Sequence, residues 1–370
     1  MKRKIHYVLV LILTMGLMTG CWDQKLLKDT RFILAITLDK EEDGKITGTY
    51  SSPNAKSYPK STILTTVEGH TIRDLTLGVA DKVSETLDTS RLRMIFFSEK
   101  IAKEDGIFPY LDISLRDPNN PLQALLAITK GDAKDYLIDP IPGEGIPSEY
   151  YKYLLESGHD RAILPKVNVL LGSRIFHNEG NDMLLPYLSK SKDKTPKIEG
   201  LALFNGGTFT GEILNQSESI LYNIMNGAEI NAQPELIEKI FYDNEPNIEN
   251  YVSLNISDAD KKMDIEIKEG KVTGNIIVHL DAEIIESPKK SVVKNRKEMS
   301  MKLERKLNEH GNEVIRKLQE ANCDGLSFGR YLMAFQNKDF KKLNWKDGAF
   351  KEADVTVKFT IRIAEHGLIS

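Results

Sequence analysis

The spacing of hydrophobic and polar positions changes along the chain, and each spacing predicts a different element. Residues 32–38 are apolar apart from Thr37, and residues 94–97 are all apolar, which predicts two buried strands. Residues 46–50 can return as a hairpin partner of the first strand. A different spacing begins after residue 70, where apolar residues recur three and four positions apart and therefore share one helical face. These residues are Ile72, Leu75, Val79 and Val83.

Shorter signals continue this alternation of strands and helices up to about residue 193. Ser98 is placed to cap a short helix that ends near Gly106, because a serine hydroxyl can accept a hydrogen bond from a free N–H of the first turn. Residues 122–129 predict a further strand and residues 131–137 a further helix. Residues 51–61, which contain two prolines, predict a loop.

The segment from residue 189 to residue 200 reads SKSKDKTPKIEG and is charged, poor in apolar residues and interrupted by Pro196. Such a composition is typical of a linker between domains. Beyond it, apolar residues 200–204 and 209–214 flank an Asn205-Gly206 pair. Asn-Gly favours the positive φ angles of a tight turn, so this stretch predicts a β-hairpin.

The C-terminal half alternates regularly between apolar and polar residues over 252–256, 263–267 and 272–284. This period of two predicts a half-buried antiparallel sheet with a polar outer face. A long charged helix is expected at about 293–321, and the alternation over 353–363 predicts a last strand beside the strand at 272–284. The expected fold class is therefore α+β, with several domains and mostly antiparallel sheet in the C-terminal half.

The N-terminus carries the pattern of a lipoprotein signal peptide. Three basic residues at positions 2–4 precede a mainly apolar stretch from Tyr7 to Met18, which is shorter than the roughly 20 residues of a spanning helix. Thr19 and Gly20 then lead into Cys21 and resemble a bacterial lipobox. The expected product is cleaved after Gly20, and Cys21 carries an S-diacylglyceryl group and an N-acyl chain.

Charge and cysteine content narrow the classes of partner. Removal of residues 1–20 takes away Lys2, Arg3 and Lys4 and no acid, so the formal net charge falls from −4 to −7. An acidic chain has no general electrostatic attraction to nucleic acid or to anionic lipid, and we expect no nucleic-acid partner. Cys323 is the second of the two cysteines and is expected to be buried rather than reactive.

A search for catalytic and metal-binding patterns finds none that is convincing. The FNGGTFTGE stretch lacks the Lys-Ser/Thr pair of a phosphate-binding loop. Asp258, Asp260 and Glu269 have the spacing of a calcium loop, but Lys262 stands at a ligand position and Met263 replaces the glycine at the bend. The histidines are scattered, and no GxSxG elbow occurs. We expect no catalytic, cofactor-binding or metal-binding residues.

Several segments, which follow one another in the same order as in the relatives, resemble one family. GCWDQKLLKDTRFILAITLDK, SEKIAKEDGIFPYLDISLRDPN, EGLALFNGGTFTGEI and the final stretch from CDGLSFGRYLMAF onwards are similar to segments of the Ger(x)C lipoproteins, the C subunits of nutrient germinant receptors in endospore-forming bacteria. The resemblance covers almost the full length. The chain departs from the family where Arg91 or Arg93 replaces a frequent histidine, and where Pro-Asn-Asn follows Arg116 and Asp117.

The resemblance implies a protein without catalytic activity. It would be anchored by lipid on the outer face of the spore inner membrane and would assemble with the A and B receptor subunits to support nutrient-triggered germination. It also implies three domains, each with a central sheet flanked by helices. We place them after the signal peptide at residues 1–20, in residues 21–193, 197–250 and 251–370.

Two other classes of protein stay open at this point. A lipid-anchored solute-binding protein would serve a transporter, but such proteins are commonly built from long parallel βα units rather than consecutive antiparallel strands. A lipid-anchored enzyme would need a convergent polar site, which the sequence does not reveal. The nutrient, the surface that contacts the partner subunits and any direct contact with the nutrient are not readable from the sequence.

Overall fold

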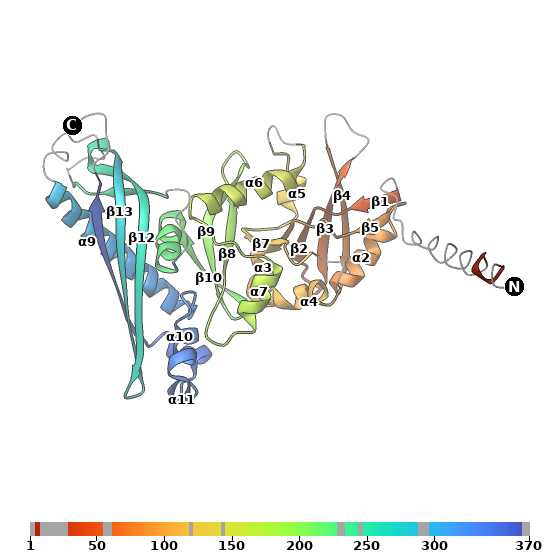
Figure 1. Cartoon of the computed structure of the whole chain (residues 1–370). Coiled ribbons are helices and arrows are strands. Elements are labelled where there is room, and N and C mark those ends of the chain that lie inside the picture. The colour runs from red at the N-terminus through yellow and green to blue at the C-terminus, as the bar shows by residue number, and fades with distance from the viewer. Residues whose placement is uncertain are drawn as a thin grey trace.

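The computed structural model describes residues 4–7, 29–54, 61–117, 121–141, 145–227, 234–242, 247–287 and 296–364. Within these residues the strands form one eight-stranded, one four-stranded and one two-stranded sheet. Figure 1 shows the two larger sheets side by side, each with helices packed against it. This arrangement confirms the predicted α+β class.

The eight-stranded sheet has the order β10-β9-β8-β7-β6-β2-β3-β4. Its centre is parallel, from β2 through β6 and β7 to β8, and antiparallel strands complete both sides. The strands are β2 (Ala35–Lys40), β3 (Ile46–Asn54), β4 (Ser61–Gly69), β6 (Met94–Ser98), β7 (Leu125–Thr129), β8 (Leu184–Lys190), β9 (Pro196–Asn205) and β10 (Thr208–Asn215). β1 (Thr30–Phe32) and β5 (Thr86–Asp88) form the small parallel sheet.

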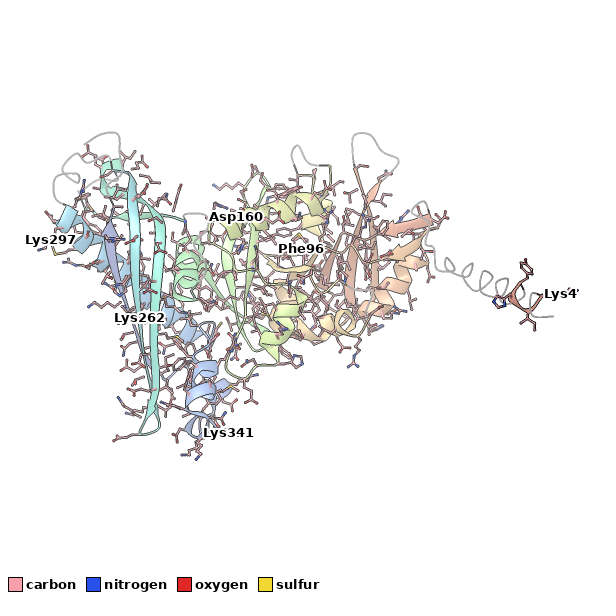
Figure 2. The ribbon with its side chains drawn as sticks, viewed as in Figure 1. Lys4, Phe96, Asp160, Lys262, Lys297 and Lys341 are labelled. Atoms are coloured by element: carbon pink, nitrogen blue, oxygen red, sulfur yellow. The ribbon has the colours of Figure 1, made fainter. Side chains whose placement is uncertain are left out.

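Helices cover both faces of the eight-stranded sheet, which explains why its central strands are apolar without alternation. Met94 and Phe96 of β6 join the core on one face, and Ile95 and Phe97 join the core on the other. The second of these cores contains residues of α2 (Ile72–Ala80), α3 (Glu99–Glu104), α4 (Phe108–Arg116) and α7 (Val169–Phe176). The first contains residues of α5 (Asp135–Ile138), α6 (Pro147–Asp160) and α8 (Gln216–Met225). Figure 2 shows Phe96 in the interior, where its side chain is fully buried.

The four-stranded sheet has the order β11-β12-β13-β14 and is antiparallel except for the β13–β14 pair. Its strands are β11 (Glu235–Lys239), β12 (Tyr251–Lys268), β13 (Lys271–Glu286) and β14 (Asp354–Ile363). The helices of this half are α9 (Arg296–Glu320), α10 (Phe328–Phe335) and α11 (Asn337–Phe340), with short helical turns at Ile248–Asn250 and Trp345–Ala349. The predicted long helix, the antiparallel sheet and the pairing of the last strand with β13 are confirmed.

The two larger sheets share one hydrophobic core. The residues that α6 and α8 bury against the eight-stranded sheet belong to the same cluster as the buried residues of α9, β12, β13 and β14. α8 lies between the sheets and joins them: the Asn223 amide donates to the Ala162 carbonyl oxygen at 2.7 Å, and the Lys317 ammonium of α9 lies 2.8 Å from the Glu218 carboxylate. The two halves are therefore packed directly against each other.

The structure corrects the predicted linker and the predicted loop. Residues 189–200 form the end of β8, a turn and the start of β9, so the eight-stranded sheet continues across the expected boundary at residue 193. The strands within 197–250 belong to two different sheets, because β9 and β10 complete the large sheet and β11 joins the small one. Residues 51–54 extend β3, and residues 61–69 form β4, which no predicted element covers. The middle of the predicted loop, residues 55–60, lies outside the described residues.

Side chains of α9 close the outer edge of β14. The Asn308 amide accepts from the Phe359 N–H at 2.7 Å and donates to the Phe359 carbonyl oxygen at 3.3 Å. Asn312 does the same for Val357, at 3.1 and 3.0 Å. The Glu304 carboxylate accepts from the Ile361 N–H at 3.1 Å. The match arises because four helical residues rise about 6 Å, close to the roughly 6.6 Å covered by two strand residues.

We predict that Asn308→Ala lowers the free energy of unfolding by about 1–2 kcal/mol, because the Phe359 N–H and carbonyl groups lose their partner. The loss should appear even though alanine favours a helix more than asparagine does. Urea denaturation of the purified chain measures it. Arg305→Ala, at an exposed position of the same helix, should change the free energy by less than about 0.5 kcal/mol. Equal effects of the two substitutions would contradict this account of the edge.

Candidate functional site at the junction of the two sheets

Two aspartates bind each other's backbone where the halves of the chain meet. Asp182 precedes β8 of the large sheet, and Asp324 follows α9 of the C-terminal half. The Asp182 N–H donates to the Asp324 carbonyl oxygen at 3.0 Å, and the Asp324 N–H donates to the Asp182 carboxylate at 2.9 Å. The other Asp182 oxygen accepts from the Gly206 N–H at 2.7 Å, in the β9–β10 turn. Asp182 thus ties that turn to the segment after α9.

The Asp324 side chain gathers three further N–H donors. One carboxylate oxygen accepts from the Phe328 N–H at 2.8 Å, and the other accepts from the Gly329 N–H at 2.7 Å and from the Trp345 indole N–H at 3.0 Å. The Asp324 residue is 1% exposed. Burial raises the pKa of Asp324 to about 8, although the three donors act to lower it. Burial likewise raises the pKa of Asp182.

Glycine is required where the two backbones meet. A Cβ atom on Gly329 would lie 2.3 Å from the Trp345 indole nitrogen and 2.6 Å from the Gly180 Cα atom. A Cβ atom on Gly180 would lie 2.2 Å from the Arg330 nitrogen, whose N–H donates to the Gly180 carbonyl oxygen at 2.8 Å. These contacts explain the Phe-Gly pair of the CDGLSFGRY segment, since a side chain at either glycine would separate the halves.

Aromatic side chains enclose the Asp324 carboxylate on the C-terminal side. The Trp345 ring lies 5.6 Å from the Phe340 ring and 5.9 Å from the Phe350 ring, and Phe350 lies 5.7 Å from Phe328, measured between ring centroids. On the other side the Tyr222 hydroxyl of α8 donates to the Gly325 carbonyl oxygen at 2.9 Å. The carboxylate is therefore closed off from solvent.

Cys323 lies next to this junction and is fully buried, as predicted. Burial raises the pKa of its thiol, which keeps the thiol protonated and poorly nucleophilic. Among the residues that the structure describes, no group of three His, Cys, Asp or Glu side chains is placed to hold a metal ion. The geometry of the junction suits a rigid connection between the two halves.

Arg91 and Arg93, where the chain differs from the family that it resembles, make contacts within the chain, and the Pro-Asn-Asn stretch at 118–120 lies outside the described residues. The Arg91 guanidinium lies 4.7 Å from the centroid of the Phe32 ring, and the Arg93 guanidinium lies 3.8 Å from the Glu149 carboxylate. Arg116 donates to Asp112 at 2.7 Å. Arg116 and Asp117 also line an open hollow of about 1030 Å³ between α2 and α4.

The predicted lipidation site, Cys21, lies outside the described residues, so the anchor stays a prediction. In the part of the chain that the structure describes, every helix is too short or too polar to cross a membrane. The rejected calcium spacing, from Asp258 to Glu269, lies in β12 and in the turn that follows it.

The segment around Asp324 was part of the family resemblance, but no role was predicted for Asp324. Asp182 and Gly180 were not predicted at all. Asp182 and Asp324 are 142 positions apart. No local spacing relates two residues at such a distance, and the Asp324-Gly325 pair is typical of any turn. The signal lay in the glycines, whose need for close backbone contact becomes visible only in the fold.

Comparison with protein families finds two matches that together span most of the chain. The family described as "Spore germination protein N-terminal domain" matches residues 23–190. The family described as "Spore germination B3/ GerAC like, C-terminal" matches residues 199–367. The border between the two matches falls at the β8–β9 hairpin.

Individual relatives are also described as spore germination proteins. The putative spore germination protein YfkR of Bacillus subtilis (strain 168) is 24% identical over 100% of this chain and 98% of its own length. Spore germination protein KC of the same organism is 22% identical over 100% and 97%. Spore germination protein GerQC of Bacillus cereus is 30% identical over 55% of each chain.

A solved structure supports the fold. The crystal structure of the GerBC protein aligns with 93% of this chain and 100% of its own chain, with a TM-score of 0.59 and 17% sequence identity. The sheets and helices described above therefore recur in an experimental structure of a protein with a very different sequence.

The buried carboxyl of Asp324 predicts how stability depends on pH. Its pKa is about 8 in the folded chain, against an ordinary value of 3.8. Between these values the folded state retains a proton that the unfolded state has released, so the free energy of unfolding falls as the pH rises from about 4 towards about 8. Asp324→Asn cannot titrate and should weaken this fall.

Urea denaturation at pH 5 and at pH 8 measures the effect. The difference between the two free energies should be smaller in Asp324→Asn than in the parent chain. Asp347→Asn, which changes an exposed carboxylate nearby, should leave the difference as it is in the parent. An unchanged pH dependence in Asp324→Asn would contradict the proposed titration.

Proposed function

Because the chain belongs to the GerAC family of spore germination proteins, we propose that it is the C subunit of a nutrient germinant receptor. In this proposal it is a lipid-anchored protein without catalytic activity. It assembles with the membrane-embedded A and B subunits on the outer face of the spore inner membrane and supports nutrient-triggered germination.

The observation that carries the proposal is the family match at both ends of the chain. The two matched regions reach from residue 23 to residue 367, and the relative YfkR aligns over 98% of its own length. Similarity over the whole length, rather than in one domain, supports a role shared with these relatives. A role in germination is therefore the best supported function.

The structure favours a mechanical contribution over turnover. The most perturbed carboxyl group described above, Asp324, is enclosed by backbone and aromatic groups rather than placed in a cleft. Such an arrangement resists separation of the two halves, because separation would break the hydrogen bonds between Asp182 and Asp324 and expose the buried Asp324 carboxyl group. A subunit of this kind can hold its partners in a fixed relative position.

Lipid attachment through Cys21 is the proposed link to the membrane. The mature chain would carry a formal charge of −7, so electrostatic attraction to anionic lipid would not retain it. Acyl chains provide affinity of about 0.8 kcal/mol for each buried methylene group. Two or more chains then suffice for stable attachment without a spanning helix.

The function is tested by deletion of the gene from the spore-forming host. Spores that lack the protein should lose or slow their response to at least one nutrient, and the response should return when the gene is restored. A normal response to every nutrient tested, in a strain without a second copy of the gene, would contradict the proposal.

We predict that Cys21→Ala shifts the protein from the membrane fraction to the soluble fraction, because the thiol that receives the lipid is lost. Cell fractionation and immunoblotting measure the shift. Cys323→Ala is the matched control: it removes the other thiol, which is buried far from the membrane anchor in sequence, and should leave the protein in the membrane fraction. A Cys21→Ala protein that stays with the membrane would mean that protein contacts hold it there.

A further inference from the structure

The two edge strands of the four-stranded sheet differ in whether their outer backbone groups have hydrogen-bond partners. The β14 edge is closed by side chains of α9, as described above. At the opposite edge is β11 (Glu235–Lys239), and none of the described strands pairs with its outer side. Edge strands with free backbone groups readily pair with a strand of another chain.

The register of β11 shows which of its backbone groups are free for such pairing. The Ile256 N–H donates to the Pro234 carbonyl oxygen, and the Ile240 N–H donates to the Asn250 carbonyl oxygen. Hydrogen-bonded pairs alternate along an antiparallel ladder, so the even-numbered residues of β11 bond to β12. The N–H and carbonyl groups of Glu235, Ile237 and Lys239 therefore point away from the sheet.

The same three residues also have exposed side chains. Leu236 and Glu238 are buried under the sheet, whereas Glu235, Ile237 and Lys239 lie on its outer face. Ile237 is 64% exposed at the middle of the strand. The neighbouring residues Tyr251 and Ile285 add exposed apolar surface, at 41% and 50%. An exposed isoleucine at the centre of an open edge strand is a feature that most soluble proteins avoid.

The order of charges along β11 is complementary to itself. If two copies of the strand run antiparallel with Ile237 opposite Ile237, then Glu235 of each copy lies opposite Lys239 of the other. Directly opposed residues of opposite charge stabilise a strand pair, and like charges destabilise it. In the same register, the free N–H and carbonyl groups of one copy face those of the other. Each facing pair of residues can then form two hydrogen bonds with each other.

We propose that β11 is a homotypic interface, in which a second copy of this chain pairs antiparallel with it around a two-fold axis at Ile237. The four-stranded sheets of the two copies then form one continuous sheet. The contact is short and therefore weak in dilute solution. Confinement of both copies to one membrane surface would raise their effective concentration and favour it.

Cross-linking of a single introduced thiol tests the register. The full chain with Ile237→Cys, in membranes of a bacterial host that expresses it, should give a covalent dimer with a short bifunctional maleimide. Ile277→Cys is the matched control, since Ile277 is 38% exposed on the outer face of the central strand β13. It should give little dimer. The parent chain should give none, because its Cys323 is buried and because, in the proposed function on which this control rests, its Cys21 thiol carries lipid.

Charge reversal tests the pairing itself. In the Ile237→Cys background, Lys239→Glu or Glu235→Lys alone should reduce the dimer yield on the order of tenfold, because the two-fold axis makes each reversal act at two opposed pairs. The double reversal restores both pairs and should restore the yield. The two single variants, with tags of different size, should cross-link to each other more than to themselves. This mixed dimer also shows that both variants fold.

Several results would overturn the proposal. The register is wrong if Ile237→Cys cross-links no better than Ile277→Cys. The pairing is wrong if Lys239→Glu leaves the yield unchanged, or if the double reversal fails to restore it. Cross-linking of Ile237→Cys to a different membrane protein, without the homodimer, would mean that the edge serves another partner.

Discussion

The pair of carboxyl groups of Asp182 and Asp324, whose oxygens must be satisfied by N–H donors, is the constraint on which the junction of the two halves depends. Asp324 obtains three donors from Phe328, Gly329 and Trp345, and its own N–H binds Asp182 across the junction. Loss of a donor that leaves a buried oxygen without a partner costs about 1–3 kcal/mol. The positions of the β9–β10 turn, the segment after α9 and the Trp345 turn follow from this one requirement.

Local patterns in the sequence were sufficient for much of the fold. The period of two over residues 272–284 and 353–363 predicted β13 and β14, and the spacing of apolar residues predicted α2 and α9, because each of these elements buries one face. The linker at 189–200 was wrong for a physical reason: a polar turn between two strands has the same composition as a connection between domains. The Asp182–Asp324 contact could not be predicted, since it depends on tertiary structure and not on spacing.

The C-terminal half combines a closed edge with an open one. Along β14, the side chains of Glu304, Asn308 and Asn312 take the place of a further strand and satisfy the backbone. β11 has no such cover among the described residues, and its charges complement those of a second β11. A rigid body with one available edge suits a subunit that arranges other proteins on a membrane surface, which is the role that we propose for this chain.

The central claim is that this protein works as part of a germinant receptor. The most direct measurement is purification of the chain, tagged at its C-terminus, from detergent-solubilised inner membrane of dormant spores, followed by identification of the proteins recovered with it. The account predicts that the A and B receptor subunits are recovered together with the chain. Recovery of neither subunit, with the chain itself present in the membrane fraction, would contradict it.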